Sequence, residues 1–274
     1  IIYCSISGWG QSGPNSPRGA YDHVIQAATG MMALQGSGAD SPPVKVGFPV
    51  IDIATGISAA EAILAALIRR LRGDTAPITL DVSMVDSALA LMSGPVATTL
   101  ASGKAPDRAG NRGFVGSPGA ETFATSDGHI SVAANTFGQF ATLCRLLGRP
   151  ELAAPPHVPD GLAKEAFLGN LATDDLRAAL SKAFAPTEAA ALETALNAAG
   201  VPAARVRDLE EYLRDLYPQT PGIGVDGEPL AIGPAFRCEP ASDVTLPPAP
   251  ALGADTEKLA PQAQDLPLRP VKTR

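Results

Sequence analysis

The sequence predicts an α/β protein in which a large α/β domain is followed by a smaller α+β domain. Three observations support this prediction. Strand-like and helix-like segments alternate over residues 1–100. A stretch rich in glycine and proline follows at 101–119, as expected of a domain boundary. A hairpin signal and further helical segments come after it, so we assign 1–100 to the large domain, 101–233 to the small domain and 234–274 to an extended arm.

The elements of the large domain follow from periodicity. β-branched or alternating residues are typical of strands at 1–6, 44–51 and 78–84. Apolar residues at helical spacing predict helices over 21–34, from Ile57 onward and over 84–100. The helix that starts near Ile57 carries one apolar stripe, formed by Ile57, Ile63, Leu64, Leu67, Ile68 and Leu71. Asp52 is expected just before this long helix.

The small domain is predicted from turn and cap signals. Strand-like residues at 121–123 and 129–133 flank Ser126-Asp127-Gly128, which indicates a hairpin. Helices are expected over 136–147, 173–184 and 187–198, because each run ends or begins at a typical cap residue. Proline and glycine dominate from Tyr217 onward, and 252–258 is the last segment expected to be ordered.

Composition and charge narrow the classes of protein. The chain has 274 residues, of which 45% are hydrophobic and 18% charged, so it can bury a core and should fold. Its net charge of -7, with no cluster of Lys and Arg, argues against binding nucleic acid. The most apolar run, 57–68, contains Glu61 and ends at Arg69 and Arg70, so we expect a soluble protein with no membrane span.

The cysteines and the first residues indicate location and completeness. Cys4, Cys144 and Cys238 lie far apart and fit neither a disulfide framework nor a metal knuckle. No signal-peptide pattern opens the sequence, so a reducing cytoplasm is the expected location. The chain begins without Met, directly in an apolar strand-like segment, and we therefore expect it to be a piece of a larger fold.

Common catalytic motifs are missing from the sequence. His23, His129 and His157 are remote from one another and form no metal-binding pattern, so no metal is predicted. There is also no GxSxG elbow, Walker loop or GxGxxG, which argues against serine hydrolysis and nucleotide hydrolysis. Asp52 is the remaining candidate, although an aspartate at this position is by itself more typical of a helix cap than of a catalyst.

An ordered series of motifs changes the interpretation of Asp52. The series is IYCSISGWGQSGP at 2–14, YDHVIQAATG at 21–30, PVKVGFPVIDIATG at 43–56, LDVSM at 80–84, GNR at 110–112, DGH at 127–129 and LG at 252–253. With these motifs the chain resembles the class III CoA-transferase family, of the formyl-CoA transferase and carnitine CoA-transferase type. The resemblance covers nearly the whole chain.

The resemblance implies a fold and an assembly. It implies that 1–100 is an incomplete Rossmann-like large domain, lacking the amino-terminal segment of the family, and that 234–274 returns to this domain. It also implies an interlocked homodimer whose active site lies between large and small domains. No permanently bound cofactor is implied, because a coenzyme A thioester is the substrate.

The resemblance also implies the roles of three residues. Asp52 matches the family's nucleophilic aspartate, which passes through an aspartyl anhydride and an aspartyl-CoA thioester. A carboxylate at a helix start suits this role, because backbone N–H groups and the helix dipole favour its ionised form. Tyr21 matches a tyrosine that contacts CoA. The family's neighbouring lysine aligns with Gly19, so Arg18 is the expected contact to CoA phosphate. The sequence does not predict which acyl donor or which acid acceptor is used.

Two alternatives remain open at this point. The same fold hosts α-methylacyl-CoA racemase, which uses a His and Asp pair. In that branch a histidine precedes an aspartate where this chain has Tyr21-Asp22, and tyrosine ordinarily ionises only near pH 10. His23 lies two residues beyond that histidine position, which on a helix is a different face. The other alternative is an inactive remnant, or one part of a split enzyme that needs a separately encoded partner.

Overall fold

The computed structural model describes residues 1–38, 40–113, 116–215 and 250–258, and its contacts divide the chain into two units. The first unit is Ile1–Arg205 and the second is Val206–Arg274. Within the second unit the described helix is α9 (Leu209–Asp215), which the sequence pattern did not predict. Most of the predicted arm, 234–274, lies outside the described residues, and the three predicted domain boundaries stay predictions.

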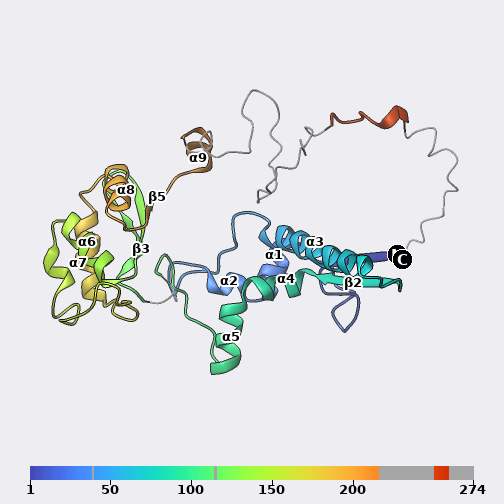
Figure 1. The fold of residues 1–274 in the computed structure, drawn as a ribbon, viewed down its shortest axis with the longest axis horizontal. Coiled ribbons are helices and arrows are strands. Elements are labelled where there is room, and N and C mark those ends of the chain that lie inside the picture. Colours follow the sequence, from blue (N-terminus) through green and yellow to red (C-terminus); the bar gives the residue numbers. More distant parts are fainter. Residues whose placement is uncertain (39, 114–115, 216–249, 259–274) are drawn as a thin grey trace. The chain divides into compact units, whose positions relative to one another are not determined.

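The predicted α/β region contains a parallel pair of strands (Figure 1). Strand β1 (Ile2–Ser7) pairs with β2 (Ile78–Ser83) in a register that runs from Ile2 opposite Ile78 to Ser7 opposite Ser83. Parallel strands need a crossover connection, and helix α3 (Val50–Leu71) supplies it and packs on both strands. The prediction of an α/β arrangement in this region is confirmed.

Shorter helices build a hydrophobic cluster around the start of α3. They are α1 (Asp22–Ala28), α2 (Met31–Leu34), α4 (Met84–Leu91) and α5 (Ser93–Ser102). The cluster has Ile25, Met31, Ile51, Ala88 and Met92 as its buried members. Ile25 of α1 and Ile51 of α3 both lie in the first turn of their helix, so this packing fixes where α1 and α3 begin.

Two predicted helices are each broken in the structure. The predicted helix over 21–34 is two helices, because Gly30 takes a left-handed conformation with φ of 82° between α1 and α2. The predicted helix over 84–100 is also wrong as one element, since α4 and α5 meet at a bend of 80°. Pro95 lies in the first turn of α5, where a proline is tolerated at a helix start but would disrupt a continuous helix.

The strand predicted over 44–51 is wrong. The segment is irregular until Val50, where α3 begins. Its β-branched residues suggested a strand, but no strand among the described residues pairs with it. The backbone N–H of Val46 instead donates to the side chain of Gln26, at 2.9 Å. Asp52 therefore lies inside the first turn of α3, not before the helix.

The apolar stripe of α3 is mostly exposed. The helix buries a different face, made of Ile51, Thr55, Ala59 and Ala66. The small side chains of the last three allow close packing on the strands and on α4. The exposed fractions of the stripe residues include 65% for Ile57, 60% for Leu64 and 86% for Leu71. The predicted helix is thus confirmed, while its stripe does not face the core of the described chain.

Helix α3 is also long and apolar enough to cross a membrane by length and composition alone. The sequence predicted no membrane span, because the apolar run 57–68 alone is too short for one. The helix that contains this run is longer, from Val50 to Leu71. The core helix of a soluble protein passes the same test, and α3 contacts β1, β2, α1 and α4. One face of α3 is therefore packed against other elements of the protein.

The following α+β part is built on an antiparallel sheet. Strands β3 (Gly119–Ala124) and β4 (His129–Ala134) form the predicted hairpin, and β5 (Ala203–Arg205) pairs with β4. Four helical segments accompany the sheet: α6 (Phe137–Leu146), η1 (Pro150–Ala153), α7 (Asp174–Phe184) and α8 (Ala189–Ala198). The three helices expected here are confirmed, with bounds shifted by one or two residues.

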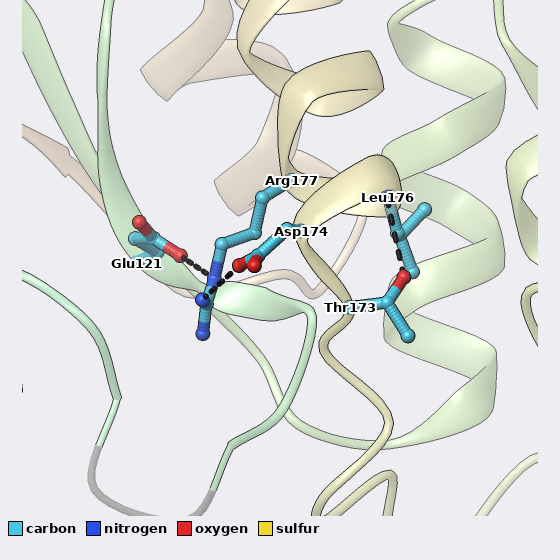
Figure 2. A network of polar contacts seen from close by, with 5 residues as sticks. All are labelled: Glu121, Thr173, Asp174, Leu176 and Arg177. Atoms are coloured by element: carbon cyan, nitrogen blue, oxygen red, sulfur yellow. Dashed lines mark hydrogen bonds and ion pairs between the residues drawn. The ribbon is translucent and has the colours of Figure 1, made fainter.

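The caps of α6 and α7 explain why these helices begin where they do. Thr136 and Gln139 form a reciprocal capping box at the start of α6. The Thr173 hydroxyl accepts from the backbone N–H of Leu176 at 3.3 Å. Figure 2 shows this cap beside an ion pair in which Arg177 of α7 reaches Glu121 of β3 at 3.0 Å and Asp174 at 3.4 Å. The Arg177 and Glu121 side chains are largely buried, so their pairing ties α7 to the sheet.

Gly119 is a position where a side chain has no room. A Cβ atom there would lie 2.8 Å from the Cβ of Ala134 and 2.9 Å from the ring of Phe140. We expect Gly119→Ala to destabilise the protein by about 1–3 kcal/mol through overpacking. Gly94, exposed in α5 with no atom near its added Cβ, is the matched control, and Gly94→Ala should be neutral or stabilising. Urea denaturation measures both, and equal effects of the two changes would contradict the packing argument.

Asp127 gives the stability of this part a pH dependence. Its carboxylate accepts the backbone N–H of Ala189 at 2.8 Å, and this hydrogen bond lowers the pKa of Asp127 below its ordinary value. A lowered folded-state pKa means that the stabilisation is present above the unfolded pKa, near 3.9, and is lost as the pH falls through the folded value. We expect Asp127→Ala to lower the melting temperature at pH 7 and to flatten its decrease below pH 4. Asp160→Ala, at an exposed aspartate, is the control, and an Asp127 variant that melts like it at every pH would refute the prediction.

Candidate active site

Asp52 lies exposed in the first turn of α3. The residue before it, Ile51, is fully buried, so the backbone at this point is anchored while the Asp52 side chain faces outward. Among the residues that the structure describes, none forms a hydrogen bond or ion pair with the Asp52 carboxylate. An exposed carboxylate without a partner is available to attack an electrophile.

Asp22 lies beside the start of α3. Its Oδ2 atom accepts the backbone N–H of Ile51 at 2.7 Å and that of Asp52 at 3.2 Å. Asp22 lies in the first turn of α1, yet it caps another helix, whose Asp52 is thirty positions further along the chain. The N–H groups expected to favour the ionised form of Asp52 therefore bind Asp22.

Gln26 extends the contact of Asp22 to the irregular segment before α3. Its Nε2 donates to Oδ1 of Asp22 at 2.5 Å, and its Oε1 accepts the N–H of Val46 at 2.9 Å. Gln26 is fully buried, so both of its amide atoms are committed to these contacts. The start of α1, the segment at Val46 and the first turn of α3 thus form one hydrogen-bonded unit.

Arg18 lies in the loop between β1 and α1. Its guanidinium lies over the ring of Trp9, 4.2 Å from the ring centre, and donates to Asn15 at 3.4 Å. The indole N–H of Trp9 donates to the carbonyl of Gly19, which fixes the residue next to Arg18. Arg18 is exposed, so its charge can meet an anion, as the prediction of a phosphate contact requires.

Tyr21 comes directly before α1, next to Asp22. Its side chain is 75% exposed, and its ring is nearly parallel to that of His23 with the centres 6.4 Å apart. So large an exposed fraction argues against a buried aromatic contact at the start of α1. Because Asp22 binds the start of α3, the chain of hydrogen bonds connects the Tyr21 segment to the Asp52 segment.

Two close contacts fix the loop at 8–20. The backbone N–H of Gln11 donates to Asp81 of β2 at 2.9 Å, a role for Asp81 that the sequence pattern did not reveal. A Cβ atom on Gly8 would lie 2.1 Å from the Cβ of Ala20, so only glycine allows the two ends of this loop to approach. Trp9 and Ala20 both pack on the cluster that contains Ile51. The three predicted site segments therefore share one hydrophobic cluster.

A cavity of about 320 Å³ lies elsewhere, beside the antiparallel sheet. It is lined by Asn111, Arg112, Glu121, Asn135 and neighbouring small residues. Asp52, Tyr21 and Arg18 do not line it. In the part of the chain that the structure describes, no group of three or more His, Cys, Asp or Glu side chains is placed to hold a metal ion.

The comparisons with known proteins agree on one family. The family model described as "CoA-transferase family III" matches residues 1–256. The succinate–glutarate CoA-transferase of Agrobacterium fabrum is 33% identical, with 83% of this chain and 55% of the relative covered. The acetyl-CoA:oxalate CoA-transferase of Acetobacter aceti is 34% identical, with 85% of this chain and 60% of the relative covered.

A solved structure supports the same grouping. The crystal structure of a CAIB/BAIF family protein from Brucella suis matches with a TM-score of 0.79 and 28% sequence identity. The match covers 96% of this chain and 68% of that protein. Against the curated relatives named above, the chain spans somewhat more than half of their length.

Proposed function

Because the chain belongs to CoA-transferase family III, we propose that the protein moves coenzyme A from an acyl-CoA to a carboxylic acid, with Asp52 as the nucleophile. The observation that supports this most directly is the exposed Asp52 carboxylate, which lies in a hydrogen-bonded helix start and has no partner among the described residues. The chain spans only part of its relatives, so the activity is proposed for the whole natural polypeptide.

The proposed reaction conserves the energy of one thioester. The Asp52 carboxylate attacks the carbonyl of the acyl-CoA, forming a mixed anhydride and releasing CoA thiolate. The thiolate then attacks the aspartyl carbonyl, which releases the donor acid and leaves an Asp52-CoA thioester. The acceptor acid attacks this thioester to form a second anhydride, and the thiolate finally takes the new acyl group. Asp52 ends as the carboxylate, and no ATP is needed.

Arg18 and Tyr21 are proposed contacts to coenzyme A. Both are exposed, and both lie in segments that pack around the first turn of α3. A guanidinium held over an indole ring offers a fixed positive charge to a phosphate group. An exposed tyrosine ring offers a flat surface to the adenine or pantetheine of the substrate. Homodimerisation and a cytoplasmic location also stay proposals.

The names of the relatives suggest which acids to test first. The two curated relatives named above are CoA-transferases whose names include succinate, glutarate and oxalate. Short dicarboxylic acids are therefore the first acceptors to offer, with succinyl-CoA and acetyl-CoA as donors. The racemase alternative has no comparable support, because Tyr21 stands where that reaction would need a base.

Hydroxylamine trapping tests the proposal. The whole natural polypeptide is incubated with succinyl-CoA or acetyl-CoA and then with hydroxylamine, which converts an acylated or CoA-bound aspartate into a stable hydroxamate. We expect peptide mass spectrometry to find the hydroxamate on Asp52, in the presence of acyl-CoA only. Modification at another carboxylate, or none with any donor of a panel that the enzyme turns over, would refute the assignment of Asp52.

A further inference from the structure

Helix α3 begins without a cap of its own. The residue before it is Pro49, whose side chain accepts no hydrogen bond from the first turn. In a capping box the side chain at the position of Asp52 reaches back to the N–H of the cap residue, but proline has no N–H. The first N–H groups of a helix need acceptors, so this helix start depends on a group from elsewhere in the chain.

Asp22 supplies that acceptor. Its Oδ2 takes both the N–H of Ile51 and the N–H of Asp52, at 2.7 and 3.2 Å. Because these N–H groups already have an acceptor, the Asp52 side chain is not needed to cap the helix. We propose that Asp22 is the positioning residue of the Asp52 nucleophile: it satisfies the start of α3 in place of Asp52, and so holds the reactive carboxylate outward and free. This inference rests on the proposed function of Asp52.

The network requires a carboxylate at position 22 and an amide at position 26. Asp22 accepts at both oxygens, because Oδ1 takes the Gln26 amide and Oδ2 takes the two backbone N–H groups. Gln26 cannot reverse its amide, since its Oε1 is occupied by the N–H of Val46. An asparagine at position 22 would place an NH2 group against another donor. A glutamate at position 26 would place two carboxylates against each other.

Exchanging the two groups restores the pattern. In the double variant Asp22→Asn with Gln26→Glu, the oxygen of the new amide accepts from α3 and its NH2 group donates to the new carboxylate. The second oxygen of that carboxylate then accepts from the N–H of Val46. Every hydrogen bond of the native network has a counterpart, while each single variant loses at least one.

The experiment compares four proteins made as the whole natural polypeptide: native, Asp22→Asn, Gln26→Glu and the double variant. We expect each single variant to lower kcat by about 10- to 100-fold while the KM for acyl-CoA changes little, because a displaced nucleophile slows the chemical step. The double variant should recover most of the native kcat. Asp86→Asn, the same change at the start of α4, is the matched control and should leave kcat within about twofold of native.

Two results would overturn the inference: a native kcat in Asp22→Asn, or a double variant no better than the single ones. Hydrogen exchange at the amides of Ile51 and Asp52 separates this test from the proposed function, because it reports the cap whether or not the protein is active. Faster exchange in Asp22→Asn and recovery in the double variant are expected. A protein with this exchange pattern but no hydroxamate at Asp52 would refute the proposed function, while unchanged exchange would refute the cap itself.

Discussion

Asp52→Asn should reduce turnover by at least about 10³-fold, since an amide cannot attack a thioester to form the anhydride. The change is nearly isosteric and leaves the backbone N–H of residue 52 bonded to Asp22, so the helix start is expected to stay intact. Binding of the CoA substrate should be nearly native. The measurements are steady-state CoA transfer and the dissociation constant of CoA.

A matched change on the same helix is the control for this prediction. Glu61→Gln also removes one exposed carboxylate from α3 and should keep native activity. If Asp52→Asn retained most of its activity, the covalent mechanism would be wrong. If it lost both turnover and CoA binding, Asp52 would be a binding residue.

Phe184→Ala is expected to have the largest effect on stability. Phe184 ends α7, is fully buried, and lies parallel to Phe123 of β3 with the ring centres 4.1 Å apart. Removing the ring leaves a cavity at the contact between helix and sheet, at a cost of about 3–5 kcal/mol. That is a large share of the roughly 5–15 kcal/mol that stabilises a typical domain.

An exposed phenylalanine provides the comparison. The Phe167 side chain is 58% exposed, and Phe167→Ala should change the free energy of unfolding by no more than about 0.5 kcal/mol. Urea denaturation followed by circular dichroism measures both variants. Similar losses in the two would show that the stacked pair does not carry the stability assigned to it.

The elements that the sequence predicted correctly have local signals. Thr173 and Thr136 stand as cap residues before apolar periodic runs, and Ser126-Asp127-Gly128 separates two strand-like segments. These signals act within a few residues, so the pattern alone locates the helices and the hairpin. The resemblance then supplied the family, which the comparisons confirm.

The errors arose where partners distant in sequence decide the structure. The β-branched residues at 44–51 have no strand beside them in the described part of the chain, and the N–H of Val46 binds a side chain instead. The role of Asp22 depends on a helix start thirty positions away. Two signals could have indicated it: Gln26 follows Asp22 at the spacing of one helical turn, and Pro49 leaves the next long helix uncapped.

The exposed aliphatic side chains along α3 have a consequence for anyone who handles this polypeptide. The row includes Ile57, Leu64 and Leu71, which are exposed to solvent. Such a row favours adsorption to surfaces, binding of hydrophobic dyes and slow aggregation during purification. Ammonium sulfate strengthens apolar association, so this chain of 274 residues should precipitate at a low concentration of the salt. Low salt and a mild detergent are the sensible starting buffer.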